Sequence, residues 1–154
     1  MIEERLLEMG LELPPAPKPA GSYVPVVEDG ELVYVSGQVP LQIGAVPDIF
    51  KGKVSSVVSV SRAQDAAKLC TLNALSHIKS AIGNLDNVSK FIRVAGYVNS
   101  DPAFADHPKI VNAASELLTN IFGDRGKHAR IAIGVNSLPL DSVIEIEFLL
   151  KSHM

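Results

Sequence analysis

The sequence predicts an α+β sandwich in which two main helices pack on one face of a mixed β-sheet. Three observations carry this prediction. Two long segments have helical periodicity, several shorter segments alternate apolar and polar residues as strands do, and the two kinds are interspersed along the chain. The expected order is two or three strands, a helix, a strand, a helix and two strands. Two helices cannot cover both faces of so wide a sheet, so another subunit should cover the second face.

The first part of the chain, residues 1–21, is expected to form a helix and a proline-rich arm. Ile2–Met9 can form a short helix ending at Gly10, and the prolines that follow keep the chain extended along the surface. Two β-prone segments come next, Tyr23–Val27 and Leu32–Ser36. The Asp-Gly pair between them is a short hairpin signal, so they should pair as the first two strands.

The middle of the chain predicts a long loop and then a helix. From Gly37 to Ser59 the periodicity is lost, which indicates a loop with one short strand near Lys53–Val57. A capping box beginning at Ser61 starts the helix, and Gly83 ends it. Its apolar stripe consists mostly of small residues and includes Cys70, which we expect to be a buried small hydrophobe rather than a reactive thiol.

The last third of the chain predicts a strand, a second helix and two final strands. Val88–Asn99 alternates as a strand does. Asp106 can cap the second helix, and Gly123 can end it. The stretch ARIAIGVNSLPLDSVIEIEF, residues 129–148, contains two strands joined by a turn near Asn136–Asp141. We expect these strands to pair as an antiparallel hairpin.

Composition narrows the classes of function. A chain of 154 residues has the length of one domain, here taken as residues 1–154. The net charge of −3 gives no long-range field that would attract a polyanion, so nucleic acid is not an expected partner. The single cysteine fits a reducing compartment. The acidic start of the chain lacks the order of a signal peptide, and no apolar run could cross a membrane. The simplest expectation is a soluble cytoplasmic protein.

Metal and cofactor motifs are missing from the sequence. The four histidines are scattered, and no HxxH, HExxH or CxxC pairing would place two ligands together. There is also no GxGxxG, no P-loop and no GxSxG. We therefore expect neither a metal nor a cofactor.

Arg130 is the most informative charged residue. It lies on a strand face whose next members are Ala132 and Gly134, and the expected hairpin would bring Glu145 and Glu147 roughly opposite it. Two interpretations are equally open from the residues alone. One is a cross-strand ion pair at a subunit seam, which contributes about 0–1 kcal/mol if exposed. The other is a ligand site, because a planar donor fork in a shallow recess suits a carboxylate.

Three further residues could contribute to such a site. Ser36 and Gly37, at the end of a predicted strand, offer a hydroxyl and unhindered backbone amides. Tyr23 ends the proline-rich arm and has a polar tip. The residues alone favour an ordinary half-buried strand tyrosine at that position.

Three segments together resemble one protein family. Ala129–Glu147 follows the pattern A-R-x-x-x-x-V-x-x-L-P-x-x-x-x-I-E-I-E without a gap, and Gly30–Pro40 follows G-N-L-hydrophobic-S-G-Q-hydrophobic-P, with Glu31 in place of Asn. FADHPKIVNAASELL is similar to an F-x-x-hydrophobic-N helix. These patterns resemble the Rid family, also called the YjgF or L-PSP endoribonuclease-like family. The resemblance covers most of the chain from Ser22 onward. The longer N-terminus and the enlarged loop after Pro40 indicate a divergent branch.

The resemblance implies a fold, an assembly and a reaction. The fold is the chorismate-mutase-like α+β sandwich, assembled as a homotrimer with a cleft at each subunit interface. In deaminating members the arginine matching Arg130 holds the carboxylate of a 2-iminoacid or its enamine. The glutamate matching Glu145 positions the water that hydrolyses the imine to a 2-oxoacid and ammonia. Tyr23, backbone near Gly37, and Asn112 complete the implied cleft, which needs no metal or cofactor.

Two more positions border the implied cleft, and alternatives to deamination stay open. Ser36 lies beside the backbone amides, and Ala132 stands where active deaminases often have cysteine. Instead of hydrolysing imines, the cleft could bind a 2-oxoacid or another small carboxylate without turnover. An endoribonuclease or translation-inhibitor role is the third alternative. The charge balance and the lack of a histidine pair for acid–base cleavage make it the least favoured.

Overall fold

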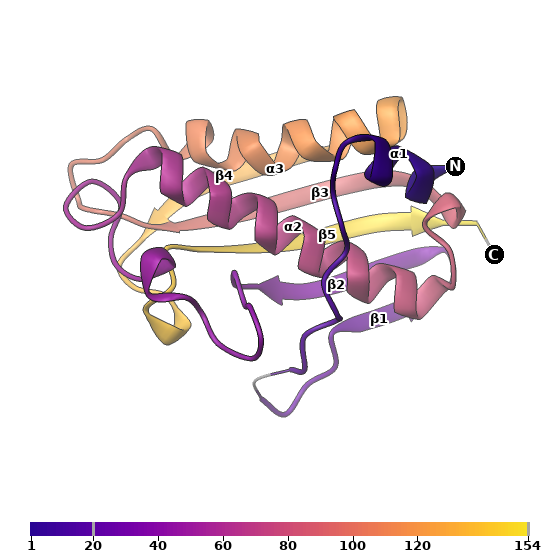
Figure 1. The fold of residues 1–154 in the computed structure, drawn as a ribbon, viewed down its shortest axis with the longest axis horizontal. Helices are drawn as coiled ribbons and strands as arrows, with labels where there is room; N and C mark the ends of the chain where they lie inside the picture. The colour runs from indigo at the N-terminus through magenta and orange to yellow at the C-terminus, as the bar shows by residue number, and fades with distance from the viewer. Residues whose placement is uncertain (20, 154) are drawn as a thin grey trace.

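The computed structural model describes residues 1–19 and 21–153, and within them it confirms the α+β architecture. A mixed sheet forms one layer and the helices form the other (Figure 1). The strands are β1 (Val26–Asp29), β2 (Leu32–Gln38), β3 (Val88–Asn99), β4 (Ala129–Val135) and β5 (Ile144–Ser152), in the spatial order β1-β2-β5-β3-β4. The helices are α1 (Ile2–Glu8), α2 (Val60–Ile82) and α3 (His107–Phe122). Short 3₁₀ turns occupy Asp48–Phe50, Leu85–Asn87, Gly123–Gly126 and Pro139–Asp141.

The main helices begin and end close to where the sequence predicts. Helix α2 ends at Gly83, whose φ of 81° suits a residue without a side chain. Its N-cap is Ser59, whose side chain accepts a hydrogen bond from the Arg62 amide, so the capping box predicted at Ser61 is wrong by two residues. Asp106 precedes α3, but its side chain makes no capping hydrogen bond.

Small side chains bring α2 close to the sheet. Cys70 is buried as expected, and its neighbours in the apolar stripe are small and buried as well. The fully or almost fully buried small residues of α2 are Ala63, Ala66, Ala67, Cys70 and Ala74. A single buried cluster joins this helix, α3 and the inner face of the sheet. The small-residue stripe therefore fixes the distance between the two layers.

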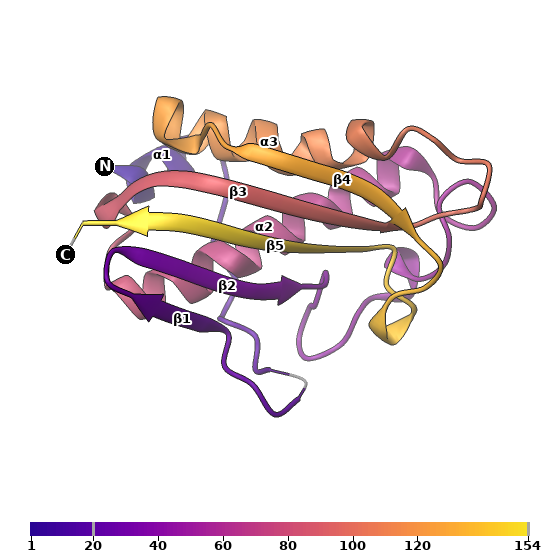
Figure 2. The same cartoon turned by 180° about the vertical axis from the view of Figure 1, so that it is seen from behind.

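The predicted antiparallel hairpin between the last two strands is wrong. Strand β4 pairs in parallel with β3, and β5 pairs antiparallel with β3 on its other side and with β2 beyond. The reason is that β3, α3 and β4 form a strand–helix–strand crossover, which returns the chain parallel to its first strand. Strand β4 therefore becomes the edge of the sheet, and β5 becomes its centre (Figure 2).

The segment before β1 is an arm that crosses α2 (Figure 1). Leu11 and Leu13 pack against the core, and the Ser76 hydroxyl of α2 donates a 2.6 Å hydrogen bond to the Pro14 carbonyl. The arm is thus fixed to the helix layer. The short strand predicted near Lys53–Val57 is not formed; Val54 makes only isolated bridges.

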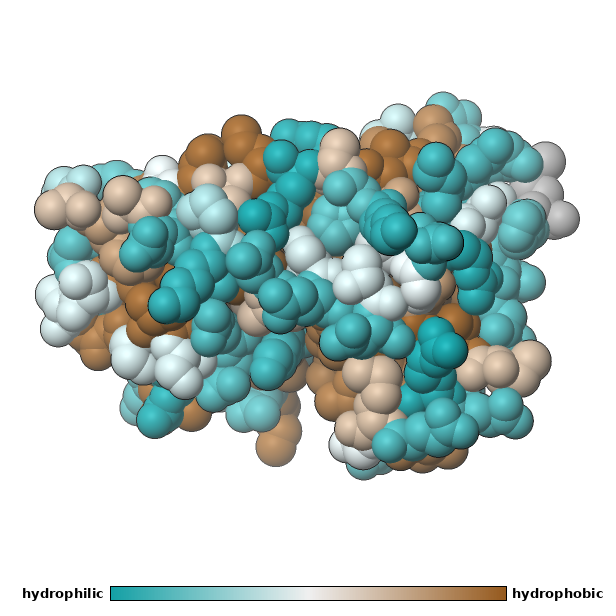
Figure 3. Space-filling view, turned by 90° about the horizontal axis from the view of Figure 1, so that it is seen from above, coloured by the Kyte–Doolittle hydropathy of each residue, from teal (hydrophilic) through white to brown (hydrophobic). Residues whose placement is uncertain are grey.

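The face of the sheet away from the helices is bare in this chain (Figure 2). Apolar side chains from several strands are exposed there, including Val27, Tyr34, Ile131 and Ile133. By contrast, the view onto the α3 side shows mostly hydrophilic residues with scattered hydrophobic patches (Figure 3). The sequence expectation of an uncovered sheet face is met.

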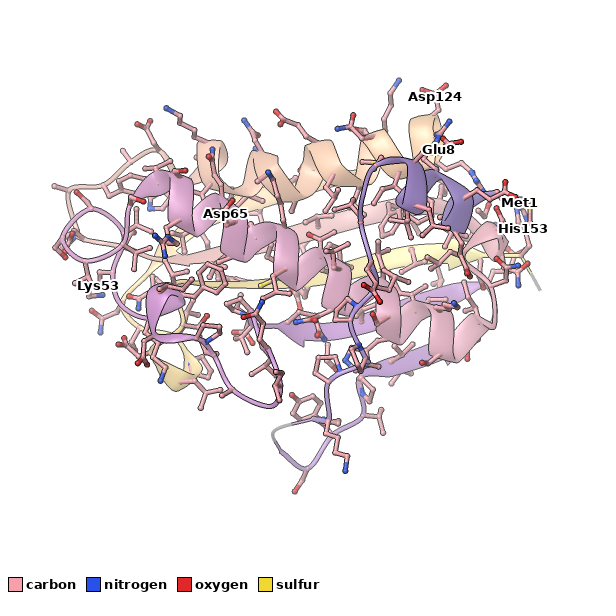
Figure 4. All side chains as sticks on the ribbon, viewed as in Figure 1. Met1, Glu8, Lys53, Asp65, Asp124 and His153 are labelled. Atoms are coloured by element: carbon pink, nitrogen blue, oxygen red, sulfur yellow. The ribbon has the colours of Figure 1, made fainter. Side chains whose placement is uncertain are left out.

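Both ends of the described chain lie at the same end of the molecule. Met1 and His153 are close together there, whereas Lys53 marks the opposite end (Figure 4). Helix α1 is held in place by an ion pair between Glu3 and Lys79 of α2 and by two hydrogen bonds. The Ile2 amide donates to the Asp86 carboxylate at 3.0 Å, and the Arg5 guanidinium donates to the carbonyl of Ile121 in α3 at 3.2 Å.

Candidate functional site

The residues predicted to form one site divide into two groups at separate places. One group lines a cavity of about 570 Å³ at the end of β2, and consists of Tyr23, Ser36, Gly37 and Glu145. The other group lies where α3 meets the edge strand β4, and consists of Asn112, Arg130 and Ala132. We call these the Glu145 cavity and the Arg130 cluster.

The two groups belong to opposite faces of the sheet. Ile144 and Ile146 are fully buried against the helix layer, so strand alternation points Glu145 to the other face. Arg130 instead contacts α3, on the helix side. Strand β3 also separates their two strands. The predicted pairing of Arg130 with Glu145 or Glu147 within one chain is therefore wrong.

Arg130 is held by neutral partners from α3. Its Nη1 donates to the Asn112 side-chain carbonyl at 2.7 Å and to the Ser115 hydroxyl at 3.1 Å. The side chain remains exposed. Within residues 1–19 and 21–153, no carboxylate lies at ion-pair distance from it. The guanidinium is thus oriented by the helix while its charge is left for another group.

A chain of hydrogen bonds fixes Ser115 behind this guanidinium. His128 Nδ1 lies 2.6 Å from the Gly126 carbonyl, and its Nε2 lies 2.9 Å from the Ser115 hydroxyl. A carbonyl only accepts, so Nδ1 carries the proton and Nε2 accepts from Ser115. Burial lowers the pKa of His128 and the Arg130 charge lowers it further, while the bond to Gly126 opposes them. His128 is therefore held neutral, and the Ser115 oxygen faces Arg130 as an acceptor.

The strip beside Arg130 is less bare than the sequence suggests. Ala132 is half-buried, as a small residue facing the helix layer. At Gly134 a Cβ would lie 2.4 Å from His107 Nε2 and 2.9 Å from the Ser100 hydroxyl. Those two side chains pair with each other at 3.1 Å. The far end of the strip is therefore filled by His107.

The Glu145 carboxylate packs directly on the backbone of Gly37. A Cβ at Gly37 would lie 2.6 Å from Glu145 Oε1, so only glycine leaves this space to the carboxylate. Burial raises the pKa of Glu145, and the nearby charge of Glu147 raises it further. A carboxylate with a raised pKa at the wall of a cavity can accept a proton from water.

Tyr23 and Ser36 border the same cavity in different ways. Tyr23 is 49% exposed, so the half-buried strand tyrosine favoured by the residues alone is not what the structure shows. The Ser36 hydroxyl donates to the Val24 carbonyl at 2.7 Å, which ties the arm to the end of β2. Its donor is therefore occupied, and only its oxygen can serve a ligand.

Glu147 belongs to a separate network on the open face. It accepts a hydrogen bond from the Tyr97 hydroxyl at 3.0 Å and forms an ion pair with Arg93 at 3.5 Å. Both members of the ion pair are about half exposed, so the pair contributes little to stability. Glu147 thus acts on Glu145 through its charge.

Sequence reasoning missed several residues of both groups. Ser115 accepts a hydrogen bond from Arg130 and is itself held by His128, while His77 and the turn residue Leu140 line the Glu145 cavity. A signal for Ser115 was available, because it lies three residues after Asn112 on the same helical face. In the sequence His77 is only one of four scattered histidines without a metal motif, and nothing there ties Leu140 to the cavity.

Two absences concern only the part of the chain that the structure describes. There, no group of three or more His, Cys, Asp or Glu side chains is placed to hold a metal ion. None of the described helices is long and apolar enough to cross a membrane.

The fold defines a protein of the chorismate-mutase-like α+β class. Residues 3–151 match the family described as "YjgF/chorismate mutase-like, putative endoribonuclease". The match spans nearly the whole chain, so this protein belongs to the YjgF family, which is the family indicated by the sequence patterns.

Known proteins agree with this membership. Protein TCP17 of Trypanosoma cruzi is 34% identical over 151 residues, covering 97% of this chain and 93% of its own. The structure of Atu1372 from Agrobacterium tumefaciens, described as a protein of unknown function, is 38% identical with a TM-score of 0.90, over 99% of this chain and 92% of that one. The structure of E. coli TdcF with bound serine is 26% identical with a TM-score of 0.63, over 90% and 94% of the two chains.

Proposed function

We propose that this protein hydrolyses reactive 2-imino acids and their enamine tautomers to 2-oxo acids and ammonia. The reaction takes place in clefts between neighbouring subunits of a homotrimer. Arg130 of one subunit holds the substrate carboxylate, and Glu145 of the next subunit positions and activates the water. The partner is thus a small carboxylated molecule, and the chemistry uses only side chains of the protein.

The observation that carries the proposal is the charge of Arg130. Its described partners, Asn112 and Ser115, are neutral, so the guanidinium is oriented but not neutralised. A preorganised donor fork without its own carboxylate suits a carboxylate ligand. The E. coli TdcF structure contains serine, which also has a carboxylate. This supports a ligand role for the arginine over a structural ion pair.

The separation of the two groups supports an assembly of several copies. One chain places Arg130 and Glu145 on opposite faces of the sheet, so a site that uses both needs residues from two chains. The bare sheet face offers apolar side chains for such an assembly, including Tyr34, Ile131 and Ile133. A closed ring of identical subunits repeats the same contact at each interface.

The reaction requires the protein to do little more than orient the imine and the attacking water. The imine carbon is already electrophilic, so water attacks it while Glu145 accepts a proton from that water. The carbon–oxygen bond forms as the carbon–nitrogen double bond becomes single. Glu145 returns this proton to nitrogen, which gives a tetrahedral carbinolamine. Glu145 then accepts the proton of the new hydroxyl group and passes it to the nitrogen, so that the carbon–oxygen bond becomes a carbonyl, the carbon–nitrogen bond breaks and ammonia leaves the 2-oxo acid. The raised pKa of Glu145 suits this exchange of a proton in both directions.

A direct assay tests the proposal. An amino-acid dehydratase or oxidase generates the imine in situ, and semicarbazide traps whatever imine survives. The wild-type protein should shorten the lifetime of the imine, and Arg130→Ala should reduce kcat/KM at least about a hundredfold, because two hydrogen bonds to a charged group are lost. Arg130→Lys serves as the matched variant, since it keeps the charge and removes the fork. Equal acceleration by wild type and Arg130→Ala would sink the proposal.

A binding module without turnover is the second candidate, favoured by the bound serine in E. coli TdcF. In that case pyruvate or 2-oxobutyrate should raise the melting temperature of the wild type but not of Arg130→Ala, while imine decay stays unchanged. The family description also names an endoribonuclease. RNA cleavage that survives removal of contaminating nucleases and disappears in Arg130→Ala would favour that activity instead.

A further inference from the structure

The Glu145 cavity extends well beyond the group that would perform the chemistry. Its volume is about 570 Å³, within the roughly 300–1,000 Å³ of pockets that bury drug-sized ligands. The imine of alanine, 2-iminopropanoate, is far smaller and would leave most of this space to water. The remaining volume is large enough to hold a further part of a larger ligand.

Most walls of the cavity are apolar. The proline-rich arm supplies one wall, the end of β2 and the residues after it supply a second, and the turn before β5 supplies a third. The apolar members are Pro17, Pro19, Pro25, Val39, Leu41, Pro139 and Leu140. The arm is anchored by the Ser76 bond to Pro14, so its wall is part of the fold. Such walls favour an apolar group of the ligand over bulk water.

Two buried polar side chains line this apolar space, and one of them, Gln38, already donates a hydrogen bond to the Ser36 carbonyl. His77 of α2 lines the cavity, is 5% exposed, and has no hydrogen bond to any other described residue. Burial lowers the pKa of His77, so the imidazole is neutral and offers one donor and one acceptor. The ring nitrogens of His77 are not among the enclosed side-chain atoms that lack a partner, so water in the cavity can reach them. A polar group of a ligand can displace that water and pair with the imidazole.

The turn that contains Leu140 has a strained backbone. Leu140 and Asp141 follow one another with φ of 59° and 55°, in the left-handed region that side chains other than glycine rarely adopt. The conformation is held by a 2.8 Å bond from the Gly52 amide to the Asp141 carbonyl. Leu140 stays 53% exposed at the cavity instead of packing in the core. Strain of this kind is concentrated at functional sites.

We infer that this cavity is a side-chain pocket, and that the preferred substrates are 2-imino acids with a bulky, mostly apolar side chain ending in a hydrogen-bonding group. The inference rests on the proposed function. The carboxylate and the imine carbon lie at Arg130 and Glu145, the apolar stem lies against the prolines and Leu140, and the polar tip pairs with His77. Imines of small amino acids fit the reacting groups but leave the pocket empty.

The test compares imines that differ only in their side chains. An L-amino-acid oxidase with catalase generates the imines of alanine, phenylalanine and tyrosine, and semicarbazide reports their survival with the wild-type oligomer present. We expect kcat/KM for the phenylalanine imine to exceed that for the alanine imine at least about tenfold. The tyrosine imine, which adds one hydroxyl, should exceed the phenylalanine imine several-fold.

Substitutions test the role of the apolar walls and the role of the polar contact at His77 separately. His77→Leu should abolish the preference for tyrosine over phenylalanine, and His77→Gln, which keeps a donor and an acceptor, should retain part of it. Leu140→Trp should lower the ratio of phenylalanine to alanine about tenfold by filling the pocket. Ile43→Trp is the matched control, because Ile43 is also an exposed loop residue with a positive φ but does not line the cavity. It should leave the ratio unchanged.

The outcomes distinguish this inference from the proposed function. If the alanine imine is hydrolysed at least as well as the phenylalanine imine, the side-chain pocket is wrong and the deaminase proposal stands. If tyrosine and phenylalanine imines react equally and His77→Leu changes nothing, the polar tip is wrong. If no imine is hydrolysed, the proposed function fails, and the pocket assignment fails with it.

Discussion

The Arg130 cluster and the Glu145 cavity each hold one ionisable group, and they do so in opposite ways. Arg130 is exposed on an edge strand and is oriented by side chains from a single helix. Glu145 lies on the central strand, against a glycine backbone, in a cavity walled by a distant arm. A permanently charged group tolerates exposure, whereas a group that must exchange protons needs burial to raise its pKa. Under the proposed function, this difference would place substrate binding and proton transfer on separate elements of the fold.

The largest expected effect comes from combining defects in the two regions. Arg130→Ala and Glu145→Gln should each be nearly inactive alone. Mixed trimers should recover about a third of wild-type activity, because in a ring that contains both variants one of the three shared clefts draws an intact arginine and an intact glutamate from different chains. Co-expression with two affinity tags yields the mixed oligomers for the imine assay. Full inactivity of mixed trimers would place the site within one chain.

Gly37→Ala is the sharpest change in the Glu145 cavity. The new Cβ would lie 2.6 Å from Glu145 Oε1 and must displace the carboxylate. We expect kcat to fall about tenfold or more, since misplacement of a catalytic group by a fraction of an ångström is costly. The melting temperature should change little, because the side chain that moves is flexible. A normal kcat would show that the Glu145 position seen here is not the reactive one.

Ser115→Ala tests the Arg130 cluster alone. The loss of one hydrogen bond from the guanidinium to a neutral hydroxyl should raise KM about three- to tenfold with little change in kcat, because the guanidinium loses orientation rather than charge. Thr119→Ala is the control on the same helix, since its hydroxyl bonds only to the backbone carbonyls of Ser115 and Glu116. Equal effects of the two substitutions would mean that helix stability, and not the orientation of Arg130, sets KM.

Glu147→Gln should give the smallest effect, on pH dependence. Glu145 must be ionised to accept a proton, so kcat/KM falls as the pH drops through its pKa. Burial and the Glu147 charge both raise that pKa, so the acid limb should lie above the ordinary glutamate range. Removing the second charge should shift the limb to lower pH without bringing it back to the ordinary glutamate range, because burial, the larger cause, remains. If the acid limb of the pH–rate profile stayed in place or moved to higher pH, this coupling between Glu147 and Glu145 would be contradicted.

The sequence carries much of the fold and less of the site. Helix ends at Gly83 and Gly123 follow from local conformational preference, and β3 (Val88–Asn99) matches its predicted bounds. The partner of β4 was predicted wrongly because adjacency in sequence was taken for adjacency in space. The strand–helix–strand order of β3, α3 and β4 already favoured a parallel crossover. Whether β4 is an edge strand depends on which strand it pairs with. The same pairing decides that Arg130 and Glu145 lie on opposite faces of the sheet.

The site residues show the same limit. Arg130, Asn112 and the Gly37–Glu145 contact involve residues that the family patterns name, and the structure brings each into one of the two groups. His77 could not be found, because its burial beside the arm depends on contacts between segments far apart in the chain. The Ser36 hydroxyl was predicted to serve a ligand because it lies at the end of a strand. In the structure it donates its hydrogen bond to the Val24 carbonyl instead.

Strand β5 is the last element of the chain and also the middle of the sheet. Within the sheet, β5 alone connects the β1–β2 hairpin to β3 and β4, with Leu32 placed opposite Lys151. During synthesis on the ribosome the two halves therefore wait, unjoined, until residues 144–152 emerge. Pairings between segments so distant in sequence form slowly and expose strand edges meanwhile. Chains truncated within residues 144–152 should form two separate half-sheets that are prone to aggregation, rather than a shortened version of the fold.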